Sequence, residues 1–182
     1  MHTQTSPIAG TFVADKDHSS ALFTVQHMKV SRFRASFTDI DARLTGSDAE
    51  LSLEGSAKVA SISITNPPIF RAHVVDGVDF FNVRLFPEIG FRSTDFRLDA
   101  DGTATVEGEL TINDITRPVT AAGALRGPVA DIAGGQSASL ELTASLDRRE
   151  WGLDWQMPLP DGENVLGWHV ELAVNLELRQ NE

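Results

Sequence analysis

The chain has 182 residues, of which 41% are hydrophobic and none is cysteine. This length suits one domain with a sizeable core, and the lack of cysteine excludes disulfides, thiolate nucleophiles and cysteine-ligated metals. The formal net charge of −11 argues against nucleic acid and anionic membrane surfaces as partners.

The N-terminal segment, residues 1–7, lacks the basic start and the apolar run of an export signal. No stretch of the sequence reaches the roughly 20 apolar residues that a membrane-spanning helix requires. The sequence therefore predicts no transmembrane segment. It also predicts a cytoplasmic location, or a periplasmic or secreted one if a signal peptide has been removed.

The first half of the chain alternates apolar and polar residues over 21–27 and again over 33–37, as half-buried strands do. The alternation changes phase at three places, which fall before residue 40, between residues 59 and 62, and between residues 91 and 96. A slip of one residue turns every following side chain to the opposite face unless a bulge absorbs it. We therefore interpret the three slips as bulges that curve the strands.

One segment, residues 66–75, departs from the strand pattern and predicts a short helix. Asn66 can cap it, Pro67 suits its first turn, and Gly77 can end it. A second short helical turn is predicted over residues 28–32.

The second half of the chain alternates more regularly. It predicts strands over 104–112, 119–125, 138–146 and 168–178. Asp101-Gly102 is typical of a hairpin turn before the first of these strands. The segment 127–137, which contains Gly127-Pro128 and Gly134-Gly135, predicts a loop.

Roughly eight strands with one apolar face predict an all-β fold, a closed antiparallel barrel with one or two short helices. A barrel of this size is either filled by side chains or holds one small ligand. Three strands carry small residues on the inward face, namely Ala104 and Gly108, Ala121 and Gly123, and Ala138 and Ala144. A ligand or the phenylalanines of other strands must fill the volume that these residues leave, so the pattern alone allows both a hollow and a filled barrel. Strands of about 11 residues would make walls about 35 Å long, which suits an extended aliphatic chain.

No motif for catalysis, metal binding or nucleotide binding is present. The sequence has no G-x-S-x-G, no P-loop and no G-x-G-x-x-G, and its histidines are scattered. We therefore predict no catalytic residues, no metal ligands and no required cofactor.

Two histidines have alternative interpretations. His27 lies on the inward phase beside Phe23 and Val25, where it is either a contact for a ligand head group or a buried histidine satisfied by its neighbours. His73 lies on the predicted helix, where a structural role and a ligand contact are both open.

The arginines of the segment 147–150 have two interpretations as well. Asp147-Arg148-Arg149-Glu150 predicts surface ion pairs at a strand end, with an arginine that grips a phosphate or carboxylate head group as the alternative. For Arg71 and Arg92, binding of a phosphate or carboxylate head group is the alternative as well.

Three blocks of sequence, within residues 15–28, 70–94 and 108–120, resemble the YceI-like family of bacterial lipid-binding proteins. The first block contains Asp15-Lys16-Asp17-His18-Ser19, the second Asp79-Phe80-Phe81-Asn82-Val83, and the third Thr116-Arg117-Pro118-Val119-Thr120. The stretch 147–153 is also similar to the family's aspartate, two arginines, aromatic residue, glycine and leucine. The resemblance extends over most of the chain, from about residue 15 to residue 178.

The resemblance implies a lipocalin-like fold, an elongated eight-stranded antiparallel barrel with a long hydrophobic lumen. It implies one domain over residues 1–182, with a core of about 10–180. Members of the family hold isoprenoid chains or other long amphiphiles and often form homodimers.

The sequence and the resemblance together predict a lipid-binding protein that transports or stores its ligand without chemistry. The ligand would be a polyisoprenoid, an isoprenoid quinone or a fatty-acyl amphiphile. Two alternatives are a small barrel enzyme, such as an isomerase or cyclase acting on such a lipid, and a ligand-free filled barrel used for protein interaction. The predicted lumen contacts are Phe23, Val25, His27, Phe37, Phe70, His73, Phe80, Phe81, Phe91, Leu110, Leu142, Trp151, Trp168 and Leu172.

Overall fold

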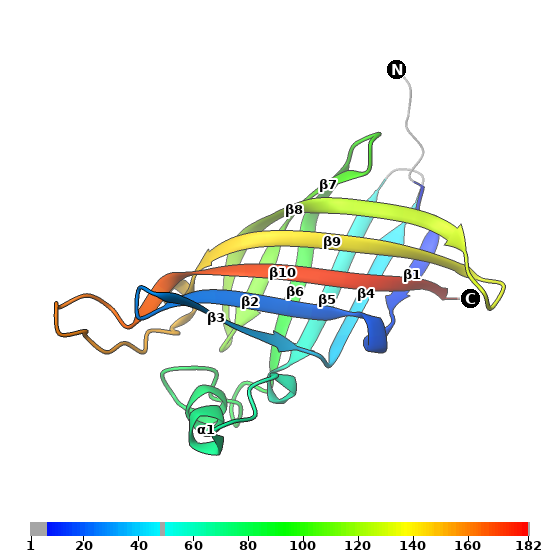
Figure 1. The fold of residues 1–182 in the computed structure, drawn as a ribbon. Coiled ribbons are helices and arrows are strands. Elements are labelled where there is room, and N and C mark those ends of the chain that lie inside the picture. The colour runs from blue at the N-terminus through cyan, green and yellow to red at the C-terminus, as the bar shows by residue number, and fades with distance from the viewer. Residues whose placement is uncertain (1–6, 48–49, 182) are drawn as a thin grey trace.

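The computed structural model describes residues 7–47 and 50–181, which form strands around a barrel and one α-helix beside it (Figure 1). The strands are β1 (Gly10–Ala14), β2 (Ser20–His27), β3 (Ser31–Phe37), β4 (Ile40–Gly46), β5 (Leu51–Lys58), β6 (Glu88–Leu98), β7 (Thr103–Ile112), β8 (Ile115–Ala130), β9 (Gln136–Asp147) and β10 (Leu166–Asn181). The helix is α1 (Pro68–Asp76), and short 3-10 helices span Lys16–His18, Val59–Ser61 and Arg148–Trp151. Among the described residues, no helix has the length and hydrophobicity to cross a bilayer.

The barrel is closed by the pairing of β1 with β10. The strand order β1-β4-β5-β6-β7-β8-β9-β10 runs through antiparallel neighbours and returns to β1. The end of β10 pairs with β1 and its earlier part pairs with β2, so β1 and β2 together make one interrupted wall strand. In the same way, β4 pairs with β1 and β3 pairs with β2. The predicted eight-stranded antiparallel barrel is thus confirmed, with its first two wall strands each broken in the middle.

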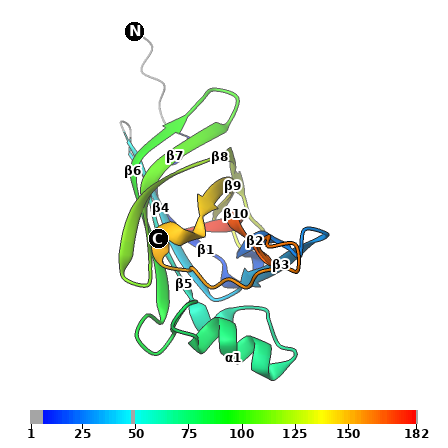
Figure 2. The ribbon, with the colours of Figure 1, turned by 90° about the vertical axis from the view of Figure 1, so that its left-hand side faces the viewer.

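Helix α1 lies outside the ring of strands, next to the free edge of β3 (Figures 1 and 2). The chain between β5 and α1 is bound to that edge, where Phe37 pairs with Ile62 and the Ser63 amide donates to the Ser36 carbonyl (2.8 Å). The Arg71 guanidinium of α1 donates to the carbonyls of Ala60, Ile62 and Ile64, at 2.8–2.9 Å. These bonds use Arg71 to anchor the helix, so it is not the head-group arginine that the sequence allowed.

Two local predictions were wrong in detail. The helix starts at Pro68 with Pro67 in the N-cap position, and Asn66 does not cap it. A residue before proline is driven out of the helical region, so Pro67, which precedes Pro68, is extended. The predicted helical turn over 28–32 is the hairpin turn between β2 and β3. Met28 and Lys29 there have positive φ angles of 51° and 64°, which belong to a tight hairpin rather than a right-handed helix.

Of the three predicted bulges, only the third is confirmed. Ser93 of β6 pairs with Gly108 of β7, and Asp95 pairs with Glu107. Two residues of β6 are therefore opposed by one residue of β7, which is the geometry of a bulge. The first slip is the break between β3 and β4, and the second is the 3-10 helix Val59–Ser61. The predicted loop 127–137 is shorter than expected, because β8 continues to Ala130 and absorbs the extra residue by a register shift between Arg126 and Val129.

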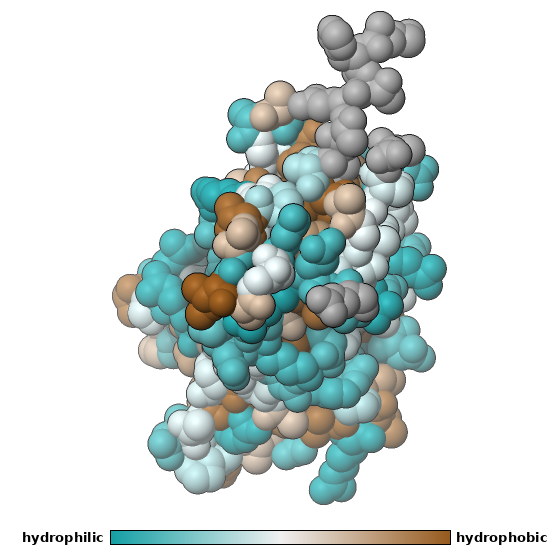
Figure 3. Space-filling view, turned by 90° about the vertical axis from the view of Figure 1, so that its right-hand side faces the viewer, coloured by the Kyte–Doolittle hydropathy of each residue, from teal (hydrophilic) through white to brown (hydrophobic). Residues whose placement is uncertain are grey.

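One end of the barrel is filled by side chains. Large residues from five strands have no solvent exposure there, namely Phe12, Leu44, Val106, Leu140 and Leu178. The outer surface of this end carries mainly hydrophilic side chains, with scattered hydrophobic ones (Figure 3). The end where β1 meets β10 is therefore closed by packed side chains.

Several of the small inward residues are explained by this packing. A Cβ at Gly108 would lie 2.4 Å from Cζ of Phe91, and a Cβ at Gly123 would lie 1.8 Å from the Glu141 carbonyl oxygen. Ala104 and Ala138 are buried in the core. The absence of large side chains at these four positions makes room for neighbouring protein atoms and not for a ligand.

Candidate ligand-binding cavity

The other part of the barrel is hollow and contains a cavity of about 520 Å³. This volume falls in the range of small-molecule sites, which are concave and mainly apolar. None of the five fully buried residues of the filled end lines the cavity. The barrel is therefore filled at one end and hollow at the other, which the sequence pattern alone could not decide.

Small side chains make the middle of the cavity wide. Ala21, Ala42, Gly55, Ala57, Ala121 and Ala144 all line it. They come from β2, β4, β5, β8 and β9, so the small residues surround much of the lumen. Ala121 and Ala144 are thus the two predicted small inward residues that do border open space.

Aromatic rings form the wall on the side of α1. Phe23 of β2 lies 6.3 Å from Phe33 and 5.8 Å from Phe37 of β3, measured between ring centroids. Phe33 meets Phe70 of α1 edge-on at 5.7 Å, and Phe37 meets Phe81 edge-on at 5.6 Å. These contacts join the helix and the loop after it to the barrel, and all five rings line the cavity.

Most of the residues that were predicted as lumen contacts lie on the cavity wall. These are Phe23, Val25, His27, Phe37, Phe70, Phe80, Phe81, Phe91, Leu110, Leu142, Trp151 and Leu172. For the eight that lie on strands the agreement follows from the strand period, because alternate residues of a barrel strand face the lumen. Phe70, Phe80, Phe81 and Trp151 lie on α1, on the loop after it and on a 3-10 helix.

Two predicted contacts, His73 and Trp168, do not line the cavity. His73 is exposed on α1, where its ring packs edge-on against Phe80 and Trp155. Trp168 leaves the inward phase of β10 because the four-residue step from Leu166 to Val170 matches a step of only two residues in β2. The extra residues interrupt the alternation on which the prediction for Trp168 rested.

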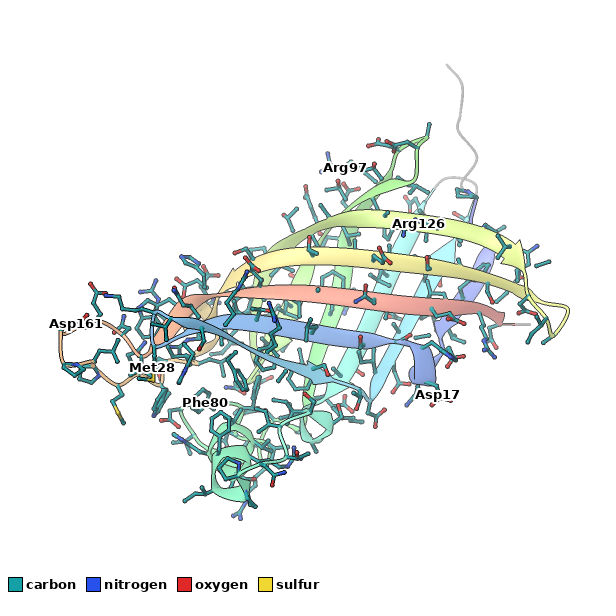
Figure 4. All side chains as sticks on the ribbon, in the orientation of Figure 1. Asp17, Met28, Phe80, Arg97, Arg126 and Asp161 are labelled. Carbon is teal, nitrogen blue, oxygen red and sulfur yellow. The ribbon has the colours of Figure 1, made fainter. Side chains whose placement is uncertain are left out.

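The sequence pattern missed several residues of the wall. Trp155 stacks on Phe80 at 5.6 Å and lies in the irregular segment between the 3-10 helix and β10, where no periodicity indicates which way a side chain points. Figure 4 shows Phe80 on the side of the barrel where α1 lies, far from Asp17.

Arg148 was also misjudged, because the surface ion pairs predicted for 147–150 form only at Arg149. Arg148 is 4% exposed and lines the cavity. Its guanidinium donates to the carbonyls of Gly167 (2.8 Å), Leu166 (3.3 Å) and Leu153. It also lies 4.4 Å from the centroid of the Trp168 ring, and its burial lowers its pKa to about 10. The arginine therefore still carries its charge at neutral pH, inside the barrel.

Asp147 supports the 3-10 helix that carries Arg148. Its carboxylate accepts hydrogen bonds from the amide (3.1 Å) and from Nε (2.9 Å) of Arg149. These bonds, opposed by desolvation, lower the pKa of Asp147 from 3.8 to about 2. Because the folded-state pKa is depressed, the carboxylate stabilises the protein above about pH 4 and loses this effect as the pH falls toward 2.

Asp147→Asn is therefore expected to lower the free energy of unfolding by about 1 kcal/mol above pH 5. This loss is smaller than the pKa shift of Asp147 alone would give, because solvent screens the side chain, which is 19% exposed. The asparagine keeps the cap acceptor and loses the charge and the second acceptor oxygen that binds the Arg149 guanidinium. Urea denaturation of both proteins from pH 6 to pH 2 measures the difference, which should shrink as the pH falls. Two curves that stay parallel over this range would contradict the assignment.

One group of potential metal ligands occurs among the described residues, at the filled end of the barrel. Single ligand atoms of Asp15, His18 and Glu177 lie within 4.8 Å of one another. Asp15 already pairs with Arg179 (2.7 Å) and His18 (3.2 Å), and the positive charge of the arginine opposes cation binding. The group is therefore explained as a surface ion-pair cluster.

The chain is similar to known proteins over almost its whole length. A UPF0312 protein of Yersinia pestis is 28% identical over 180 residues, which are 97% of this chain and 90% of that protein. The crystal structure of Burkholderia cenocepacia BcnA superposes with a TM-score of 0.73 at 17% identity and covers 90% of this chain and 98% of its own. A polyisoprenoid binding domain from Saccharophagus degradans superposes with a TM-score of 0.61 at 9% identity, over 95% of this chain and 99% of its own. At these identities the two structures show a shared fold.

The family model of the YceI-like domain matches residues 12–178, which include every strand from β2 to β9 and most of β1 and β10. This range contains the whole cavity wall. The match agrees with the resemblance of the sequence blocks and with the closed barrel. The chain therefore belongs to the YceI-like family.

Proposed function

We propose that this protein binds a long-chain amphiphilic lipid in the hollow part of the barrel and transports or stores it without chemical change or a cofactor. The ligand would be a polyisoprenoid, an isoprenoid quinone or a fatty-acyl compound. The observation that carries the proposal is the cavity of about 520 Å³ with its wall of phenylalanine and aliphatic side chains. The polyisoprenoid binding domain from Saccharophagus degradans, which shares the fold, supports the same class of ligand.

The energetics favour a long hydrocarbon chain. Burial of one methylene group contributes about 0.8 kcal/mol, so about ten buried groups contribute on the order of 8 kcal/mol before the cost of association. An apolar cavity also provides few hydrogen bonds that a compact polar ligand needs when it leaves water. The cavity wall on β10 runs from Leu166 to Leu176, a length that suits an extended chain better than a compact one.

The cavity does not favour the two alternatives. Within the described residues, the titratable side chains on the inward face of the cavity are His27 and Arg148, which do not form the hydrogen-bonded acid–base pair that an isomerase or cyclase would use. A filled barrel requires that side chains occupy the lumen, whereas the lumen here is hollow between the filled end and α1.

The test is native mass spectrometry of the purified protein, followed by solvent extraction and by uptake of farnesol and palmitic acid into the delipidated protein. The expected result is a discrete bound mass that is lost on denaturation, or saturable uptake at one site per chain. A protein that is purified without ligand and takes up neither compound would contradict the proposed function.

A further inference from the structure

We propose that the end of the cavity at the start of β10 is a head-group site, where Arg148 binds an anionic oxygen group, a carboxylate or a phosphate. The hydrocarbon tail then points toward the filled end of the barrel. This inference rests on the proposed function and specifies the class of lipid and its orientation.

The inward-facing polar groups of the cavity gather at one end of it. His27 is the last residue of β2 and pairs with Leu166, the first residue of β10. Arg148 directly follows β9 and donates to the Leu166 carbonyl. Strand β10 lies between β2 and β9, so the two side chains reach the same end of the lumen from the two sides of β10.

The remainder of the inward face is apolar. The other polar residues that border the cavity are Asp41, Glu54, Ser56 and Thr143. They lie on the outward phase of β4, β5 and β9, next to the small inward residues that bring the lumen close to the backbone. A head group placed anywhere but beside Arg148 and His27 would thus face hydrocarbon.

Arg148 forms no ion pair in the described part of the chain, although the charges of Asp147 and Asp154 act on it from a greater distance. Among the described residues, no carboxylate lies within 4.0 Å of its guanidinium, because Asp147 bonds to Arg149 instead. A buried charge is costly unless it is paired or fully hydrogen-bonded. Carbonyl groups accept from three of the five N–H donors of the guanidinium, so two donors remain for a ligand, and the charge is balanced only by the more distant carboxylates and by the Trp168 ring.

The other cations of this region do not compete for the ligand. Arg149 forms its ion pair with Asp147 outside the lumen, with half of its side chain exposed. Lys29 pairs with Asp161 at 3.2 Å, also in solvent, and Figure 4 shows Asp161 in the outermost loop of this end. Arg148 is thus the cation of the described chain that lines the lumen, and it provides the geometry that suits carboxylates and phosphates.

The wild-type protein can report the orientation of the ligand by tryptophan fluorescence. The three tryptophans of the chain are Trp151, Trp155 and Trp168, which all lie beside Arg148 or in the segments that adjoin it. Stearic acid with a nitroxide near the carboxyl group should quench this fluorescence at least twice as strongly as stearic acid with a nitroxide near the methyl end. Equal or reversed quenching, at equal occupancy, would overturn the proposed orientation.

A head-group series tests the role of Arg148. Palmitic acid, hexadecyl phosphate and hexadecanol share one tail, so their difference in affinity reports the head group alone. We expect Arg148→Gln to weaken one or both anionic ligands at least tenfold and to change hexadecanol by less than threefold, and we expect Arg148→Lys to restore part of the loss. The matched control is Arg149→Gln, which removes the neighbouring charge outside the lumen.

Each outcome of the series has a distinct meaning. Loss of palmitic acid alone assigns a carboxylate site, and loss of hexadecyl phosphate alone assigns a phosphate site. Equal weakening of all three ligands would show a purely structural arginine and overturn the head-group site while the proposed function stands. Wild-type protein that binds none of them would contradict the proposed function itself. If Arg148→Gln does not fold, a wild-type protein that binds the anions no more tightly than the alcohol overturns the head-group site.

Discussion

Ala144→Phe is expected to reduce the uptake of a long-chain lipid at least tenfold while the barrel stays folded. Ala144 lies in the C-terminal half of β9, pairs with Leu172 of β10 and borders the cavity. A phenyl ring at this position occupies space that the tail of the ligand would fill. The loss of only two methylene contacts, about 1.6 kcal/mol, already exceeds the 1.4 kcal/mol that correspond to a factor of ten. Titration of the delipidated variant with palmitic acid measures the effect.

The matched control for this variant is Ser145→Phe. Ser145 follows Ala144 on the same strand, is exposed and lies on the opposite face of the wall. The same ring is therefore added outside the lumen, and the affinity should stay within twofold of the wild-type value. Equal affinities for both variants would show that the lipid binds elsewhere, and the proposal of a lumenal site would then fail.

Phe12→Ala is expected to lower the free energy of unfolding by about 3–5 kcal/mol, the cost of removing a large ring from a packed core. Phe12 is fully buried and pairs with Leu44 across β1 and β4, where the barrel closes. The void has no ligand to fill it, because Phe12 does not line the cavity. Urea denaturation measures this loss, and the dependence of the unfolding free energy on urea concentration should stay unchanged. The loss is a large part of the stability of an ordinary domain.

Phe33→Ala is the contrasting variant. Phe33 is half-buried and already borders open space, so removal of its ring should cost about 1–2 kcal/mol and should weaken lipid binding. Phe12→Ala should retain the affinity of the wild type, provided that the measurement is made where the variant is folded. The reverse pattern, with Phe33→Ala the more unstable and Phe12→Ala the weaker binder, would contradict the separation of a stabilising end from a binding end.

This separation has a physical basis in the energetics of cavities. An empty apolar cavity forfeits the contacts that its lining would otherwise make, and the filled end compensates for that loss. The ring pairs that attach α1 and its loops to β3 add a second, smaller cluster on the hollow side. The protein therefore keeps an apolar lumen in the absence of ligand because the strands are fixed elsewhere.

The strands and the side chains of their two faces were predictable from the sequence because a barrel strand repeats every two residues. Eight of the predicted lumen contacts lie on strands and on the cavity wall for this reason, whereas Phe70, Phe80, Phe81 and Trp151 reach the wall from α1, a loop and a 3-10 helix. The prediction failed where the period is interrupted. Trp168 lies in the irregular stretch of β10, and Trp155 lies in a segment without regular structure.

The amino-acid sequence by itself predicted a barrel of roughly eight strands with an apolar interior, because strand periodicity and turn residues act locally along the chain, and the resemblance of its sequence blocks indicated the family. The tertiary structure decided which small residues leave a void, since Gly108 accommodates the ring of Phe91 whereas Ala144 faces open space. It also decided that Arg148 is buried while Arg149 is exposed, although they are neighbours in the same motif. Both distinctions depend on atoms from distant strands, which the closure of the barrel brings together and no local pattern records.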